Sequence, residues 1–332
     1  MGDNMNKVSE FNERKFIYIL KALALFSIVT AHVGTITNNT PISIIYSLIL
    51  SSIGSIGVGL FFLISGYLFS KSNKSFRIFS KTKLTTIIIP WFFCGTILFL
   101  YVALRKGDLN LYNWFITITV HSHLYFLSVL MVFYFIFWRL KNNLYFLLYN
   151  IGLSIISISL TGLGWVPIYP YINPFNWSIY FILGMLIKKY DLLEKIAVFC
   201  KKWFLYISGI YALIFIIYLF NGVAITYWKY ASIIAELAAI AFVFGVAFYC
   251  LNFQKVNSIV YIGKMSFSIY LLHTAFAGIF TNIFSRFNLW YLSILIPFIV
   301  IILTIAGIEF GRWISRKIKV NRILDLLIGV RM

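Results

Sequence analysis

The stretch FIYILKALALFSIVTAHVGTI, residues 16–36, decides the fold class of this chain. It is almost wholly apolar, and its exceptions include Lys21 and His32. At a rise of 1.5 Å per residue, about 20 apolar residues make a helix long enough to cross the hydrocarbon core of a bilayer. The stretch therefore predicts a membrane-spanning helix.

Similar apolar runs recur along the whole chain. Of its 332 residues, 61% are hydrophobic and only 11% are charged, whereas about a quarter of the residues in a soluble domain are charged. We expect an all-α, polytopic integral membrane protein with about ten transmembrane helices in one bundle. The expected spans are 16–36, 46–70, 84–104, 124–140, 143–161, 175–188, 203–222, 230–250, 266–284 and 291–311.

The basic residues predict the orientation of these spans. With the N-terminus inside, the cytoplasmic segments hold 23 Lys and Arg residues and the outer segments hold four. Short loops rich in Lys and Arg stay in the cytoplasm. We therefore expect a cytoplasmic N-terminal tail (1–15), a transmembrane domain (16–311) and a cytoplasmic C-terminal tail (312–332), with no removable signal peptide.

The net charge of +19 is spread between the apolar runs and forms no single patch. This distribution suits anionic lipid headgroups and does not favour nucleic acid as a partner. Cys94, Cys200 and Cys250 have no paired spacing, so we expect neither a disulfide framework nor a cysteine metal site.

Lys21 and His32 lie eleven positions apart, which brings them to nearly the same face of one helix. Ionisable groups inside a span are costly and mark function by default. The structural alternatives are a lysine that snorkels to the interface and a histidine that bonds a neighbouring helix. The pair predicts a polar stripe with one group near each end of the helix.

None of the four histidines, His32, His121, His123 and His273, lies in an expected cytoplasmic loop. No pair has the i, i+4 spacing of helical zinc ligands and no acidic partner is adjacent, so we expect no metal. General acid–base chemistry suits them better, since histidine titrates near neutral pH. Glu236 is a carboxylate within a span, either an ion-pair partner or a functional acid.

Four blocks occur in order along the chain: Lys21 with His32 ten intervening residues later, FFLISGY (61–67), HLYFL (123–127) and SFSIYLLH (266–273). The glycines of the second block and before it suit close approach of a backbone or of a ligand. Together the blocks resemble the membrane-bound acyltransferase family 3, integral-membrane O-acyltransferases of bacterial envelope sugars. Lys21 stands where many members have arginine, and Tyr125 where tryptophan is usual.

The resemblance implies a multi-pass enzyme of the bacterial plasma membrane. It would transfer an acyl group, by default acetyl, from cytoplasmic acyl-CoA to a hydroxyl of an envelope or secreted glycan. Acyl-CoA is then a co-substrate, and no bound cofactor is expected. The expected partners are the glycan, membrane lipids and separate glycan-synthesis proteins.

The expected site has two parts. His32 would be the general base or the acyl acceptor, assisted by His123, His273 and Glu236. Lys21 would act at the other end of the same helix, where the donor is seated. The residues expected to bind or attract the donor are Lys21, Ser65, Gly66, Tyr67, Lys71, Lys74 and Arg77.

Two other classes remain open from the residues alone. A transporter or flippase of a glycan or lipid-linked sugar also uses membrane histidines and carboxylates, although no internal symmetry is evident. A non-catalytic subunit of a glycan-synthesis complex would keep the blocks for packing. The acceptor is open among secreted polysaccharide, peptidoglycan, teichoic acid and lipid-linked sugar, and its accepting group could be an amine in place of a hydroxyl. The acyl group and the oligomeric state are open as well.

Overall fold

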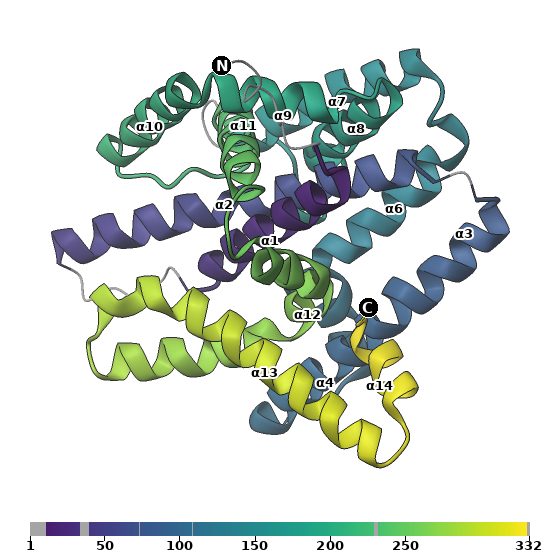
Figure 1. Cartoon of the computed structure of the whole chain (residues 1–332). Coiled ribbons are helices and arrows are strands. Elements are labelled where there is room, and N and C mark those ends of the chain that lie inside the picture. Colours follow the sequence, from purple (N-terminus) through teal and green to yellow (C-terminus); the bar gives the residue numbers. More distant parts are fainter. Residues whose placement is uncertain (1–10, 34–39, 73, 108, 229–231, 331–332) are drawn as a thin grey trace, which may run out of the picture.

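The computed structural model describes residues 11–33, 40–72, 74–107, 109–228 and 232–330 (Figure 1). These residues form helices and loops, with no β-strand among them, so the all-α prediction is confirmed. The first ten residues of the expected N-terminal tail, the end of the first expected span, the start of the eighth and Lys229 lie outside the described residues.

The helices are α1 (Glu13–Ala31), α2 (Pro41–Ser70), α3 (Phe76–Lys83), η1 (Leu84–Ile88), α4 (Ile89–Lys106), α5 (Leu111–Ile116), η2 (Thr117–His121), α6 (Tyr125–Leu140), α7 (Leu144–Gly162), η3 (Pro170–Ile172), α8 (Phe175–Lys189), α9 (Leu193–Lys202), α10 (Phe204–Phe220), α11 (Ser232–Cys250), α12 (Val256–Arg286), η4 (Trp290–Leu295), α13 (Ile296–Lys317) and α14 (Asn321–Ile328).

Six helices among the described residues are long and apolar enough to cross a bilayer. Two bent pairs, α5–η2 with α6 and α9 with α10, raise this number to eight if each pair is one span. The six are Pro41–Ser70, Phe76–Leu104, Leu144–Gly162, Ser232–Cys250, Val256–Arg286 and Trp290–Lys317. The remaining two expected spans coincide with α1, which carries several charges, and with α8, which has 15 residues. The polytopic helical fold is confirmed, and the number ten and the orientation stay predictions.

Helix α1 lies at the centre of the bundle, packed against α2, α11, α12 and α13 (Figure 1). Its first turn is capped by the Asn12 side chain, which accepts a hydrogen bond from the Lys15 backbone N–H at 2.9 Å. Glycines on its neighbours allow backbones to meet: a Cβ atom at Gly263 of α12 would lie 1.9 Å from the Tyr18 carbonyl oxygen. Such small residues drive helix association in membranes, where burial of apolar area does not.

Helices α2 and α8 approach each other in the same way, through glycines on both sides. A Cβ atom at Gly66 would lie 1.9 Å from the Phe181 carbonyl oxygen, and one at Gly184 would lie 1.9 Å from the Leu63 carbonyl oxygen. Of the two readings of the glycine-rich block, close approach of backbones is therefore the one that the structure supports at Gly66.

A helical segment over residues 111–121, expected as part of an outer loop, precedes α6 and meets it at an angle of 73°. The bend is stabilised locally. The Ser122 hydroxyl accepts a hydrogen bond from the Leu124 N–H at 3.2 Å, and the Ser128 hydroxyl donates to the Thr119 carbonyl at 2.8 Å. His123 consequently lies in a fixed turn at the start of α6.

Candidate active site

Three histidines far apart in the sequence meet at one end of α1. The ring centroid of His32 lies 5.7 Å from that of His123 and 5.1 Å from that of His273, and the last two are 5.1 Å apart. His32 caps the C-terminus of α1, His123 comes from the turn before α6, and His273 from α12. We call these three residues the histidine cluster.

Tyr270 holds two members of the histidine cluster. Its hydroxyl donates a hydrogen bond to the His123 carbonyl, and its own carbonyl lies 2.8 Å from Nδ1 of His273. Because a carbonyl oxygen can only accept, Nδ1 of His273 must carry the proton of that bond. In a neutral ring, Nε2 of His273 is then a proton acceptor, and it has no hydrogen-bond partner among the described residues.

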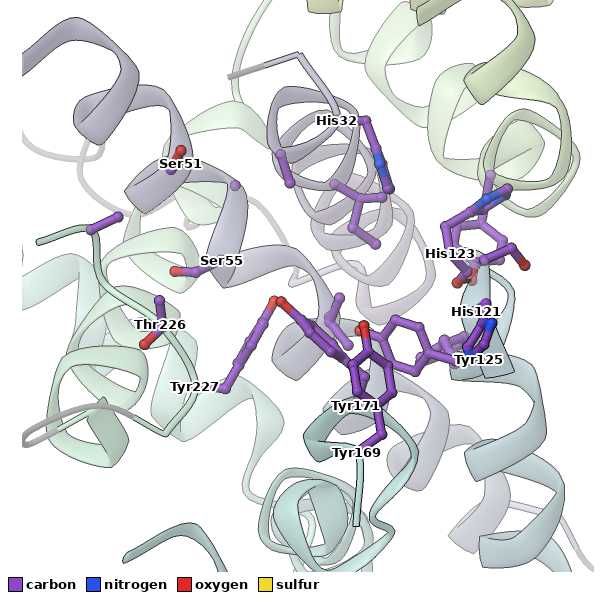
Figure 2. A pocket seen from close by; sticks show the side chains of 18 of the residues that line it. His32, Ser51, Ser55, His121, His123, Tyr125, Tyr169, Tyr171, Thr226 and Tyr227 are labelled. Atoms are coloured by element: carbon purple, nitrogen blue, oxygen red, sulfur yellow. Dashed lines mark hydrogen bonds between the residues drawn. The ribbon is translucent and has the colours of Figure 1, made fainter. Parts of the chain in front are cut away.

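A cavity of about 410 Å³ lies beside the cluster, and His32 and His123 line it. His273 is fully buried and does not line it. Figure 2 shows that tyrosine rings gather across this cavity from His32. They are Tyr125, Tyr169, Tyr171 and Tyr227. Among the described residues, no Lys, Arg, Asp or Glu lines this histidine cavity.

A second cavity, of about 260 Å³, lies toward the other end of the polar stripe of α1. Three lysines line it: Lys21, Lys83 and Lys264. The ammonium nitrogens of Lys21 and Lys264 lie 5.6 and 6.0 Å from the ring centroid of Tyr18. No Asp or Glu is present among the described residues that line this lysine cavity.

Lys83 and Lys264 were not predicted as site residues. Lys83 closes α3 and donates a hydrogen bond to the Tyr134 hydroxyl at 3.1 Å, and Lys264 lies on α12 near Ser266. The sequence placed both in basic segments beside spans, but their meeting with Lys21 depends on how three distant helices pack.

Two side chains, Phe126 and Tyr270, line both cavities. Their ring centroids lie 5.8 Å apart. The structure places the two residues of the predicted stripe at different cavities that share a wall. His32 lies at the C-terminus of α1 as expected, but Lys21 lies near the middle of this helix and not near its other end, because α1 begins at Glu13.

Among the expected donor residues, Ser65 lines the lysine cavity with Lys21. Gly66 faces the α8 backbone instead, and Tyr67 is buried without lining either cavity. Lys74 and Arg77 are exposed and line neither cavity.

Lys71 pairs with Glu13, at 2.6 Å between Nζ and Oε1, and lines neither cavity. Burial works to raise the pKa of Glu13, but the hydrogen bond and positive charge of Lys71 outweigh it, and the pKa lies below its usual value. The pair ties the start of α1 to the end of α2.

Glu236 is fully buried on α11 and lines neither cavity. It interacts electrostatically with the tyrosines Tyr180 and Tyr227, and Tyr227 lines the histidine cavity. Among the described residues, no group of three His, Cys, Asp or Glu side chains is arranged to hold a metal ion.

Comparison with known proteins gives one match. Residues 14–308 match the family described as an acyltransferase domain. No curated protein and no solved structure matches the chain. The matched range covers the histidine cluster and both sets of lining residues except Gly329.

Proposed function

The chain belongs to the membrane-bound acyltransferase family 3 and is a membrane acyltransferase, and from that premise we propose that it moves an acyl group, acetyl by default, from cytoplasmic acyl-CoA to a hydroxyl of an envelope or secreted glycan. The observation that carries this proposal is the pair of cavities with a shared wall, one lined by lysines and the other by histidines. The protein would act in the bacterial plasma membrane with the lysine cavity facing the cytoplasm.

The lysine cavity suits the donor because coenzyme A carries several phosphate charges. Lys21, Lys83 and Lys264 supply positive charge with no carboxylate among the described lining residues. A lysine binds phosphate as a point charge with rotatable donors, so the three ammonium groups attract the polyanion without fixing one geometry. Exposed basic side chains such as Lys74 and Arg77 add long-range attraction.

The histidine cavity suits a sugar hydroxyl as acceptor. Its tyrosines present both apolar ring faces and hydroxyls, which is the combination of apolar walls and a few polar groups that small-molecule sites use. The acyl end of the donor would reach this cavity past Phe126 and Tyr270.

The reaction needs one base. His32 takes the proton of the acceptor hydroxyl while its oxygen attacks the thioester carbonyl carbon. The new C–O bond forms, the C–S bond breaks, and the departing thiolate takes the proton back from the imidazolium. His123 and His273 orient His32, with Glu236 as a more distant support. In the covalent variant of this scheme, His32 first accepts the acyl group and then passes it to the hydroxyl.

A vesicle assay tests the proposed function. Acyl-labelled acetyl-CoA is supplied to the cytoplasmic face of sealed vesicles that contain the protein and native envelope glycan. We expect label on the glycan at the opposite face, and fractionation then identifies the acceptor. If the vesicles are sealed and hold a verified acceptor, absence of label contradicts acetyl transfer and favours the transporter class.

Substitution of Lys21 separates donor binding from snorkelling. We expect Lys21→Ala to raise the KM for acyl-CoA at least about tenfold, because a charged hydrogen bond is worth about 1.5–3 kcal/mol. Lys21→Arg retains the charge and should retain most of the activity. Lys195→Ala, which changes an exposed lysine of α9 that lines neither cavity, is the matched control and should keep the parental KM. Parental kinetics for Lys21→Ala would mean that Lys21 snorkels to the membrane interface and does not contribute to donor binding.

A further inference from the structure

The C-terminal segment folds back onto the bundle and reaches the lysine cavity. Helix α14 packs against α4 and α13 (Figure 1), and Gly329, the residue after it, lines the cavity. This segment lies beyond residue 308, where the match to the acyltransferase domain ends. The cavity therefore has one wall that the matched domain does not supply.

An ion-pair bridge fixes α14 to α13. Nε of Arg312 donates to Oδ1 of Asp325 at 2.8 Å, and Nη1 of Arg312 donates to Oε1 of Glu309 at 2.9 Å. The Arg312 side chain is only 14% exposed, so this pair is shielded more than a surface salt bridge. On the other side, Cys94 of α4 donates a weak hydrogen bond to the Leu327 carbonyl at 3.7 Å, and Ile328 is buried.

The end of α14 has the backbone shape that allows this docking. Gly329 has φ of +71°, and the Val330 N–H bonds back to the Asp325 carbonyl at 3.0 Å, which closes the helix. A Cβ atom at position 329 would lie 2.7 Å from the ring of Phe267, another residue of the lysine cavity. Only glycine combines this conformation with this contact.

We propose that residues 321–330 form a docked wall of the donor cavity, and that its docking through Asp325 and Gly329 sets the affinity for acyl-CoA. This inference rests on the proposed function of the lysine cavity as the donor site. An undocked wall leaves part of a bound donor in contact with water, and the histidine cluster is untouched. Donor binding therefore weakens while the chemical step does not.

Two variants undock the segment by different routes. Asp325→Asn removes the charge that pairs with Arg312, and Gly329→Ala places a methyl group against Phe267 at a positive φ. Gly107→Ala is the matched control, because Gly107 also follows a helix with φ of +70°, but a Cβ atom added there would have no neighbouring atom within 4 Å. We expect both test variants to raise the KM for acetyl-CoA at least about fivefold with kcat within about twofold, and the control to change neither.

The thiol of Cys94 reports docking without reference to turnover. Cys94 is 2% exposed under α14, and replacing Cys200 and Cys250 by serine leaves it as the single thiol of the chain. We expect N-ethylmaleimide to label Cys94 faster in Asp325→Asn and Gly329→Ala than in the parent. Acetyl-CoA should slow labelling of the parent, because a ligand that binds the docked form stabilises it.

The two readouts separate this inference from the proposed function. Faster labelling with an unchanged KM overturns the role of the wall in donor binding, and unchanged labelling in both variants overturns docking through these residues. If the parent transfers no acetyl group but acetyl-CoA still slows labelling of its Cys94, the result contradicts the proposed reaction and supports residues 321–330 as a wall of the donor cavity. If the parent shows no turnover and acetyl-CoA gives Cys94 no protection, both the proposed function and the role of the wall are overturned.

Discussion

Replacement of His32 by alanine is expected to lower the rate of acyl transfer at least about a hundredfold, because a positioned general base contributes about 10² to 10⁴ in rate. The fold should persist, since His32 is exposed at the end of α1 and lines a cavity instead of filling the core. The measurement is the initial rate of label transfer at saturating acetyl-CoA, with the amount of folded protein determined by size-exclusion chromatography.

His121→Ala is the matched control for this prediction. His121 lines the same cavity, with its ring centroid 6.4 Å from that of Tyr169, but it is not a member of the histidine cluster. We expect near-parental rates from it. Normal turnover by His32→Ala removes His32 from the catalytic step, and an equal loss in both variants points to a general effect on the cavity.

Gly66→Ala is expected to destabilise the protein by about 3 kcal/mol or more, at the upper end of the range for overpacking. The added methyl group would have to occupy space 1.9 Å from the Phe181 carbonyl oxygen, and a backbone atom of a packed helix cannot move aside as a flexible side chain does. The measurement is thermal unfolding in detergent, followed by the loss of monodisperse protein.

Gly209→Ala, on α10, is the control for Gly66→Ala because nothing lies within 4 Å of its Cβ position. There the change should stabilise slightly, by about 0.5–1 kcal/mol, since alanine loses less conformational entropy than glycine in a helix. The two substitutions are thus expected to differ in sign. Parental stability of Gly66→Ala combined with weaker donor use would reverse our reading and return Gly66 to the donor site.

The sequence predicted the features that depend on local pattern. Long apolar runs located the helices because a bilayer demands a minimum apolar length. The spacing of Lys21 and His32 predicted one stripe on α1 because helical periodicity is fixed, and the structure places the two residues at different cavities.

What the sequence did not predict depends on contacts between distant segments. Lys83 at the end of α3 and Lys264 on α12 join Lys21 of α1 only because these three helices, distant in the sequence, border one cavity. The helix over 111–121 was missed because it ends at the bend that holds His123, where the apolar run is interrupted by His121, Ser122 and His123. The glycine block was ambiguous in sequence, since a glycine that admits a backbone and one that admits a ligand look alike.

The wall formed by Phe126 and Tyr270 has an electrical consequence. Carrying one elementary charge through a potential of 100 mV costs about 2.3 kcal/mol, and coenzyme A carries several. In an arrangement where the polyanion stays among the lysines on one side of that wall, the acetyl group passes it in exchange for the proton of the acceptor hydroxyl, so the charge on each side is unchanged and no net charge crosses the membrane. Acylation of a glycan outside the cell would then proceed at the same rate in energised and in depolarised cells.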